Sequence, residues 1–151
     1  MMIHYKGTPD EMRALGAYIK LMRASETVLS EMTKHTVAAS LTISQLGTLE
    51  ALHHLGPIPQ KDIAKKILKS SGNITTVVDN LEREKLVHRV RDTRDRRFVY
   101  VHLTAEGRRV VQQYFPTHVE EITRLMSVLT PDEQDTLAAI CKKLGIGIVG
   151  A

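Results

Sequence analysis

The hydrophobic positions between Ile58 and Thr104 change their spacing partway along, and the two spacings predict different elements. The first part repeats at helical spacing, through Ile63, Ile67, Ile74, Val77, Val78 and Leu81. After Leu86 the spacing falls to two residues, as in a strand with one buried face, through Val99, Val101 and Leu103. We expect helices over residues 60–68 and about 73–85, and hairpin strands over 87–91 and 98–103. A helix pair followed by a hairpin is the order of a winged helix-turn-helix.

Amphipathic segments before this stretch predict two further helices. Asp10 is expected to cap a helix that runs to about Val37 and carries an intermittent apolar stripe. This helix is long for a domain of this size, which favours packing against a second subunit. Thr42 opens the next helix, which Gly56-Pro57 stops, and Ile58 is a candidate for a one-residue strand contact.

Two helices are also expected after the hairpin. Thr104 is expected to cap the first of them, and Pro116 should kink or break it near Phe115 because proline lacks the backbone N–H donor. Thr130 begins a sharp helix start, with proline and two acidic residues following it. That last helix is expected to end at about Leu144, before the Gly-rich tail. The fold class is therefore mainly α with a small β-hairpin wing.

Composition narrows the class of protein. The chain has 151 residues, 42% hydrophobic and 25% charged, which suits one folded domain over 1–151. Aromatic residues are scarce, which argues against single-strand binders that stack bases on aromatic rings. Apolar runs are too short for a membrane span, and the N-terminus lacks the apolar core of a signal peptide. With the single cysteine, Cys141, these features predict a cytoplasmic protein with no membrane contact.

Positive charge is concentrated between residues 60 and 110, which include the predicted helix pair and hairpin. Residues 60–110 contain 13 Lys/Arg against 7 Asp/Glu, a net charge of +6, whereas the remainder has 8 against 10, a net charge of −2. Such a distribution suits a polyanionic partner, because each neutralised phosphate releases condensed counterions. The alternative is a solvated helical face.

The helix around residues 71–85 is expected to present a polar arc opposite its apolar face. Short polar side chains let a helix enter the major groove and meet the base edges. The candidates for DNA contact are Asn73, Thr75, Thr76, Asn80 and Arg83. Asp79 also lies on this arc, where it would accept from a cytosine amino group or orient Arg83.

Two serines precede this arc. Ser70 and Ser71 lie near the helix N-terminus, where free backbone N–H groups favour phosphate, so we include both as candidate DNA contacts. The alternative is that one of them caps the helix.

The loop between the hairpin strands, residues 91–97, contains four arginines in seven residues. A guanidinium on a thin hairpin can enter a narrow minor groove, where negative potential is focused. Here the candidates are Arg94, Asp95, Arg96 and Arg97, with the aspartate pairing with an arginine to fix its approach. The alternative is that the charges only keep the loop solvated.

Several short motifs resemble the multiple antibiotic resistance regulator (MarR) family. They are LT-x-x-Q at Leu41–Gln45, DIA at Asp62–Ala64, LEREKLVHR at Leu81–Arg89, and D-x-R-x-x-x-V-x-LT at Asp95–Thr104, followed by AEG. They cover about 40–107, and the flanking helices have the expected order.

The resemblance implies a six-helix homodimer that binds a pseudo-palindromic operator. In this reading, helices within 1–40 and 105–151 form the dimer, and 41–104 form the DNA-binding lobe. The second helix of the motif enters the major groove, and Arg97 in the wing enters the minor groove. The resemblance also implies that a small anionic or phenolic ligand binds between the dimer helices and the lobe and weakens operator binding.

Other chemistry has little support in the sequence. Cys141 is expected to be a buried or dimer-interface thiol, with redox sensing as the alternative because Lys142 and Lys143 follow it. His53-His54 point apart on a helix, and His88 and His102 are expected to face each other on the hairpin, but neither pair supplies a metal site. We expect no cofactor, and no catalytic motif is present, so an enzyme is not predicted.

The sequence therefore predicts a dimeric, sequence-specific DNA-binding transcriptional regulator, a repressor released by a small ligand. One alternative is a ligand- or protein-binding module with the same fold that has lost specific DNA binding. An architectural DNA binder without sequence preference is the other.

Overall fold

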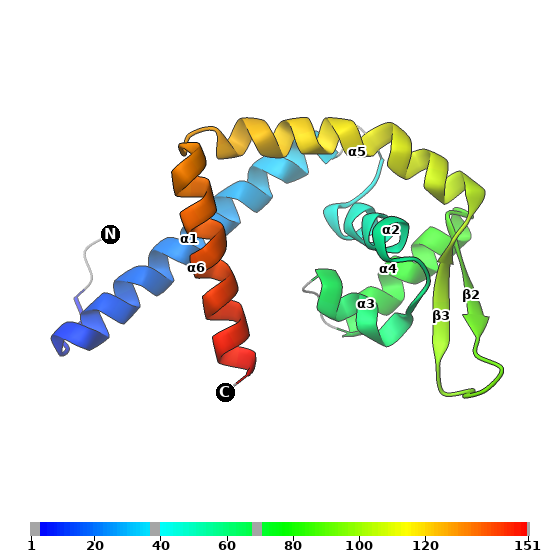
Figure 1. The fold of residues 1–151 in the computed structure, drawn as a ribbon, viewed down its shortest axis with the longest axis horizontal. Helices are drawn as coiled ribbons and strands as arrows, with labels where there is room; N and C mark the ends of the chain where they lie inside the picture. Colours follow the sequence, from blue (N-terminus) through cyan, green and yellow to red (C-terminus); the bar gives the residue numbers. More distant parts are fainter. Residues whose placement is uncertain (1–3, 37–39, 68–70, 151) are drawn as a thin grey trace. The chain divides into compact units, whose positions relative to one another are not determined.

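A computed structural model describes the backbone of residues 4–36, 40–67 and 71–150. The chain divides into two compact units, residues 1–43 and 44–151. Figure 1 shows the elements in chain order. None of the described helices is long and apolar enough to cross a membrane.

The first unit is dominated by α1, Pro9–Thr36. Thr8 caps this helix, so the expectation that Asp10 caps it is wrong. The Thr8 hydroxyl accepts from the Glu11 N–H, and the Glu11 carboxylate accepts from the Thr8 N–H. This reciprocal pair satisfies two backbone donors, which one aspartate in the first turn cannot do. Asp10 instead pairs with Arg13 at 2.6 Å. The expected end at Val37 lies outside the described residues.

The second unit begins with α2, Ile43–Leu55, followed by β1, Ile58–Pro59, and α3, Gln60–Ile67. These elements begin as predicted. Gly56 has φ +77°, a conformation that glycine adopts without strain, and it lets the chain leave α2 directly into β1. The predicted strand contact at Ile58 is real, since Ile58 pairs with Val101.

The next helix, α4, spans Ser71–Arg83 and ends two residues before the expected Lys85. Lys85 adopts φ +62° and donates its backbone N–H to the Glu82 carbonyl, and the Leu86 N–H reaches the Leu81 carbonyl. These two bonds form a Schellman motif, which satisfies the last helical carbonyls and reverses the chain. Helical periodicity alone does not reveal this reversal, because Leu86 still falls at an apolar position.

The strands form a three-stranded antiparallel sheet in the order β1-β3-β2. β2 spans Val87–Arg91 and β3 spans Val99–Leu103, with Val87 opposite Leu103 and Arg91 opposite Val99. Figure 1 shows α2, α3 and α4 beside this sheet, with the hairpin extending beyond them. In the described part of the chain, six helices and a small sheet confirm the predicted fold class.

Two long helices follow, and both differ from expectation. α5, Ala105–Met126, starts at the predicted Thr104 cap but continues through Pro116, so of the two outcomes predicted there, a kink or a break, the break is wrong. Proline removes one backbone bond, which the intact turns on either side tolerate; Figure 1 shows α5 bending without interruption. α6, Pro131–Val149, has the predicted capping box at Thr130 but continues past Leu144. Glycine weakens a helix without forbidding it, so Gly145 and Gly147 do not end α6.

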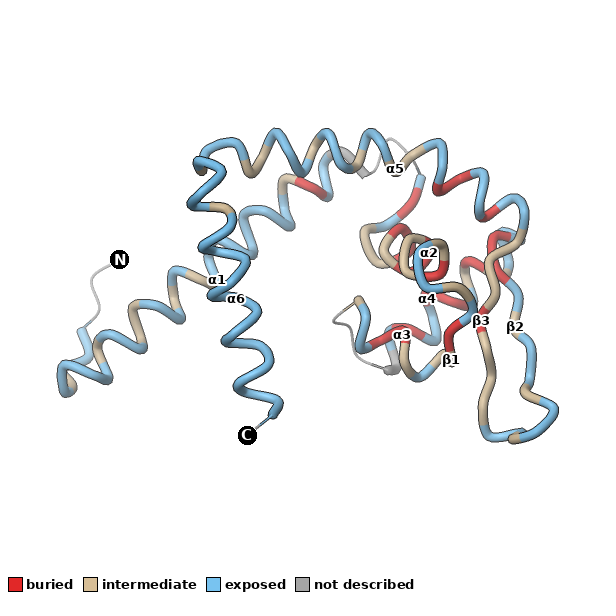
Figure 2. Tube along the Cα trace, viewed as in Figure 1, coloured by how far each residue is buried: buried red, intermediate tan, exposed pale blue. Residues whose placement is uncertain are grey.

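The core of the second unit is formed by side chains from α2, α3, α4, α5 and the sheet. Its most deeply buried side chains are Leu49, Ile63, Ile74, Val78, Leu81, Val87, Val101 and Val111. Figure 2 shows the buried positions gathered in this lobe, while α6 is exposed along its length. Gly107 joins α5 to the lobe: a Cβ there would lie 2.1 Å from the Leu86 carbonyl oxygen, so only glycine fits.

Candidate nucleic-acid interface

Helix α4 has one buried face and one polar, solvent-facing face. Ile74, Val78 and Leu81 are at most 1% exposed, and Val77 is buried as well. This confirms the apolar face predicted from the sequence. The opposite face carries the exposed side chains of Asn73, Thr75, Thr76, Asp79 and Arg83, with Asn80 partly exposed. The helix is therefore anchored to the lobe on one side and presents hydrogen-bonding groups on the other.

The polar face is internally organised. The Arg83 guanidinium donates to the Asn80 side-chain oxygen at 3.2 Å. Asp79 does not orient Arg83, which corrects that expectation; its carboxylate accepts from Arg89 of β2 at 2.6 Å. The sequence cannot reveal this pairing, because Asp79 and Arg89 are ten residues apart and meet only when the hairpin folds back against α4.

The two serine candidates are only partly covered by the structure. Ser70 lies outside the described residues, and Ser71 is the first residue of α4, described there by its backbone alone. Their proposed roles as a helix cap or a phosphate contact stay predictions. Asn73, in the first turn of α4, is exposed.

The wing loop is shaped by a small set of hydrogen bonds. The Asp92 carboxylate accepts from the backbone N–H groups of Arg94 and Asp95, at 2.7 and 3.2 Å. Arg91 donates to the Arg96 carbonyl at 2.6 Å. These bonds hold the loop in a fixed turn that leaves Arg94, Arg96 and Arg97 exposed.

Arg97 and Asp95 form the pair expected at the wing tip. The Arg97 guanidinium donates from Nε and Nη2 to both carboxylate oxygens of Asp95, at 3.0 and 2.8 Å. This bidentate geometry lowers the pKa of Asp95 and raises the pKa of Arg97, through the side-chain hydrogen bond in each case. Arg97 nevertheless remains 87% exposed. The wing thus presents a cation whose direction is fixed.

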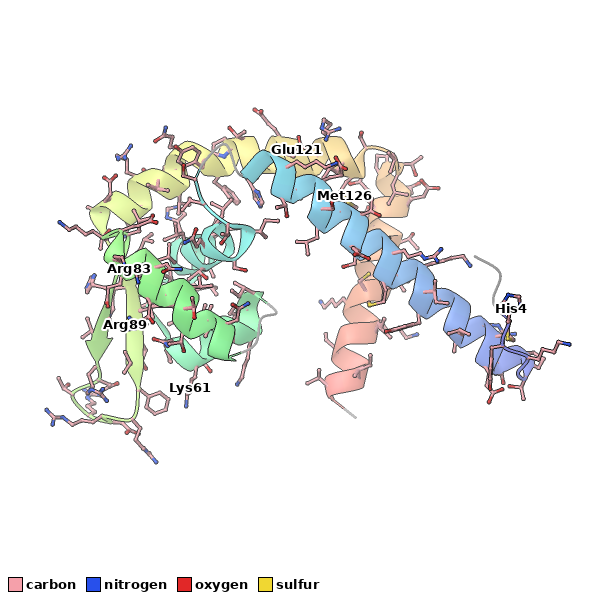
Figure 3. The ribbon with its side chains drawn as sticks, turned by 180° about the vertical axis from the view of Figure 1, so that it is seen from behind. His4, Lys61, Arg83, Arg89, Glu121 and Met126 are labelled. Carbon is pink, nitrogen blue, oxygen red and sulfur yellow. The ribbon has the colours of Figure 1, made fainter. Side chains whose placement is uncertain are left out.

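Sequence reasoning missed three residues at this surface. Arg89 and Gln60 link the hairpin to the helix pair, since Arg89 Nε donates to the Gln60 side-chain oxygen at 2.8 Å. Lys61 Nζ lies 3.9 Å from the centre of the Phe98 ring. Figure 3 labels Arg89 beside the hairpin and Lys61 at the end of the lobe near the wing tip. No local pattern marks these residues, because their partners lie on distant segments.

A hollow lies between the start of α3, the start of α4 and the wing. Its lining residues include Gln60, Lys61, Thr75, Arg97 and Phe98. It therefore brings the polar start of α4 and the wing arginine to one surface, as two parts of one DNA contact would require.

The remaining candidate residues are Cys141 and the histidines of the hairpin. Cys141 is exposed on α6, so burial within its own chain is wrong, while a dimer-interface position stays a prediction. The rings of His88 and His102 stack with centroids 5.1 Å apart, as the hairpin pairing predicted. Within the described residues, no group of three or more His, Cys, Asp or Glu side chains is arranged to hold a metal ion.

A helix pair with an exposed polar second helix, followed by a charged β-hairpin, defines a winged helix-turn-helix DNA-binding protein. Residues 41–99 match the family model of the MarR family. The chain is 36% identical over 134 residues to YkoM of Bacillus subtilis (strain 168), an uncharacterized HTH-type transcriptional regulator, covering 89% of this chain and 87% of YkoM. It is 34% identical to the HTH-type transcriptional regulator MhqR of the same organism, covering 89% and 92%. The chain belongs to the MarR family of transcriptional regulators, which are DNA-binding proteins and not enzymes.

Two solved structures share this fold. MepR of S. aureus, in a complex with DNA, is 26% identical with a TM-score of 0.72, covering 85% of this chain and 94% of MepR. BpsR of Bordetella bronchiseptica, whose DNA binding is regulated by 6-hydroxynicotinic acid, is 25% identical with a TM-score of 0.79, covering 86% and 98%.

Proposed function

We propose that this protein is a cytoplasmic homodimer that represses genes by binding a pseudo-palindromic operator and is released by a small anionic or phenolic ligand. Helix α4 lies in the major groove, and the wing, residues 91–97, reaches the adjacent minor groove. Residues 41–104 form the DNA-binding lobe, and helices within 1–40 and 105–151 form the dimer.

The observation that carries this proposal is the pairing of an exposed polar helix face with a fixed, exposed wing arginine. The α4 face offers donors and acceptors of the size that base edges accept. Arg97 supplies a cation for the narrow minor groove. The proposed DNA contacts are Ser70, Ser71, Asn73, Thr75, Thr76, Asn80 and Arg83 from α4 and its start, and Arg94, Asp95, Arg96 and Arg97 from the wing.

A dimer is supported by apolar side chains that the single chain leaves in solvent. Leu137, Ile140, Leu144 and Ile148 recur along α6 at spacings of three and four residues, and each is at least 39% exposed. An apolar stripe of this kind normally packs against another surface. A two-fold dimer would set two copies of α4 about 34 Å apart, one turn of the duplex, and so match a pseudo-palindrome.

Ligand control and repression are two further parts of the proposal. The regulation of BpsR by 6-hydroxynicotinic acid supports an aromatic acid as the first ligand class to test here. Repression follows from occupancy, because a dimer holding both grooves of a promoter obstructs the polymerase. We expect 6-hydroxynicotinic acid to weaken operator binding, measured by fluorescence anisotropy. Benzoate, an aromatic acid without the hydroxyl group on the ring, is the comparison ligand.

The central test begins with duplexes that the wild-type protein selects from a random-sequence pool, which needs no knowledge of the operator. Selected sequences should be two-fold symmetric, and binding should weaken steeply with salt. Arg97→Ala should weaken binding about tenfold and lower the salt slope by about one, because it removes one cation from the minor groove of the DNA. Unchanged affinity for Arg97→Ala at every salt concentration would refute the wing assignment.

The matched control is Arg109→Ala, which removes an exposed, ion-paired arginine outside the helix pair and wing. It should leave operator affinity unchanged. Substitutions at Thr76 or Asn80 should alter base preference more than overall affinity, because those side chains would read base edges. If no sequence is enriched over unrelated DNA, the protein is an architectural DNA binder and not a sequence-specific one.

Asp79, a carboxylate on the proposed DNA face, is the residue that favours the alternative of a module without specific DNA binding. The ion pair between Asp79 and Arg89 weakens this argument for the alternative, because the carboxylate is partly neutralised. A chain that binds neither the random pool nor unrelated duplexes at low salt would restore this alternative.

A further inference from the structure

Arg89 sits where the hairpin meets both helices of the DNA-binding lobe. It lies on β2, opposite Val101, and its side chain is only 22% exposed. Its donors are directed inward: Nε to Gln60 at 2.8 Å, Nη1 to Glu82 at 3.0 Å and Nη2 to Asp79 at 2.6 Å. Its backbone N–H also donates to Glu82 at 3.0 Å. One guanidinium thus joins the start of α3, two positions of α4 and the hairpin.

The fork geometry of arginine is needed for this arrangement. A guanidinium presents its donors in one rigid plane, so three partners in different directions fix its position and it fixes theirs. Lysine has a single charged nitrogen and cannot meet all three at these distances. The register of α4 against the hairpin is therefore held by polar bonds as well as by the apolar core.

The network continues to the DNA-facing surface. Because Gln60 uses its oxygen to accept from Arg89, its amide nitrogen points the other way and donates to the Thr75 hydroxyl at 3.3 Å. Thr75 is exposed on the polar face of α4. The orientation of a proposed base-contacting side chain thus depends on Arg89 through Gln60.

The same contacts control charge on the DNA-facing surface. Asp79 is 51% exposed and Glu82 is 41% exposed, both on the helix proposed to enter the groove. Without a cation beside them, these carboxylates would repel the DNA phosphates. Arg89 is the cation that pairs with both.

We infer that Arg89 is a positioning residue for DNA recognition, acting through Gln60, Asp79 and Glu82 and not through its own contact with DNA. It neutralises acidic side chains on α4 and sets the orientation of the face that reads the bases. Asp79 is accordingly an internal partner of Arg89 and not a reader of cytosine. The inference rests on the proposed DNA contact of α4.

The experiment uses full-length protein, a duplex selected by the wild type from a random pool, and an unrelated duplex of equal length. Arg89→Gln should weaken binding to the selected duplex by at least about tenfold and reduce its preference over the unrelated duplex. Adding Asp79→Asn to that variant should recover much of the lost affinity, because the unpaired carboxylate is removed. Simple additivity of the two substitutions would overturn the inference, since it would mean that Arg89 acts independently of Asp79.

Two further variants separate charge from geometry. Arg89→Lys keeps the charge but loses the fork, so affinity for the unrelated duplex should stay near wild type while preference for the selected duplex falls. If Arg89→Lys matched the wild type in both affinity and preference, the positioning role of Arg89 would be overturned. Arg109→Gln, which removes an arginine paired with Glu106 on α5, is the matched control and should change neither quantity.

Asp79→Asn alone keeps the inference testable if Arg89→Gln fails to fold, which thermal unfolding would detect. Affinity for the selected and unrelated duplexes should change by the same factor, because Asp79 touches no base and the asparagine oxygen can still accept from Arg89. A changed base preference would instead make Asp79 a base contact and overturn the inference. If the wild type prefers no duplex, the proposed function itself fails; if it does and the Arg89 variants match it, only this inference fails.

Discussion

Lys85, two residues after the end of α4, adopts a backbone conformation that residues with a Cβ usually avoid. Its φ of +62° allows the Schellman bonds to Glu82 and Leu81 that turn the chain into β2. The left-handed conformation costs about 1–2 kcal/mol for a residue other than glycine. The start of the wing thus depends on one strained residue, whose carbonyl also accepts from the Thr104 hydroxyl at 2.8 Å.

Lys85→Gly should stabilise the fold by about 0.5–1 kcal/mol, because relief of the strained conformation outweighs the greater entropy that glycine has in the unfolded chain. Thermal and urea unfolding of the full chain would measure the gain. Lys85→Ala is the control: it removes the same charge but keeps the Cβ, so it should bring no gain. Equal stability of the glycine and alanine variants would contradict this account.

At the scale of elements, the wing combines rigidity with charge. Asp95 lowers the net positive charge of the loop, yet it holds Arg97 through two hydrogen bonds. If charge alone governed DNA binding, removing this carboxylate would help. If the orientation of Arg97 governs DNA binding, removing the carboxylate should weaken binding overall. A preorganised guanidinium does not have to be ordered when DNA binds, and losing this advantage should reduce affinity more than the added positive charge raises it.

We therefore expect Asp95→Asn to weaken binding to the selected duplex several-fold, about three to ten times, despite the gain of positive charge. Asp132→Asn, at an exposed acid in the first turn of α6, is the matched control and should have no such effect. Anisotropy titrations at one salt concentration would compare them. Tighter binding by Asp95→Asn would show that charge outweighs orientation in this wing.

The same pair gives a pH expectation. The pKa of Asp95 is lowered from 3.8 by its bond to Arg97, so the pair is fully formed above that value. It is lost only as the pH falls through the depressed folded pKa. Between pH 6 and 8, about the range used for DNA binding, the pair should therefore contribute no pH dependence.

At the scale of the whole molecule, the exposed stripe of α6 is the clearest sign of assembly. Ile140 is 58% exposed, between Leu137 and Leu144 on the same helical face. Ile140→Lys should shift the proposed dimer to monomer, since it would place a charge within an apolar contact. Sedimentation at several concentrations would measure the shift. Asp135→Lys, on the opposite face of α6, is the control; a dimer that withstands Ile140→Lys would exclude this stripe from the interface.

Much of the fold follows from local sequence. Apolar spacing within 58–104 is enough to predict two helices and a hairpin, because burial of one face imposes the period of each element. Caps at Thr104 and Thr130 are visible because their partners lie three residues away. The pairing of Asp95 with Arg97 is predictable because the two residues lie only two positions apart in a single motif. Errors arose where local signals compete: Thr8 displaced Asp10 as a cap, and neither Pro116 nor Gly145 ended its helix.

The sequence by itself thus determined the elements, their order and the charged tip of the wing, since all of these depend on neighbours along the chain. Only the tertiary structure decided how the reading surface is held together. Arg89 meets Asp79, Glu82 and Gln60 because the hairpin folds back against two helices. The spacing of residues along the sequence does not predict these contacts, because three separate elements must pack before one guanidinium can reach all three side chains.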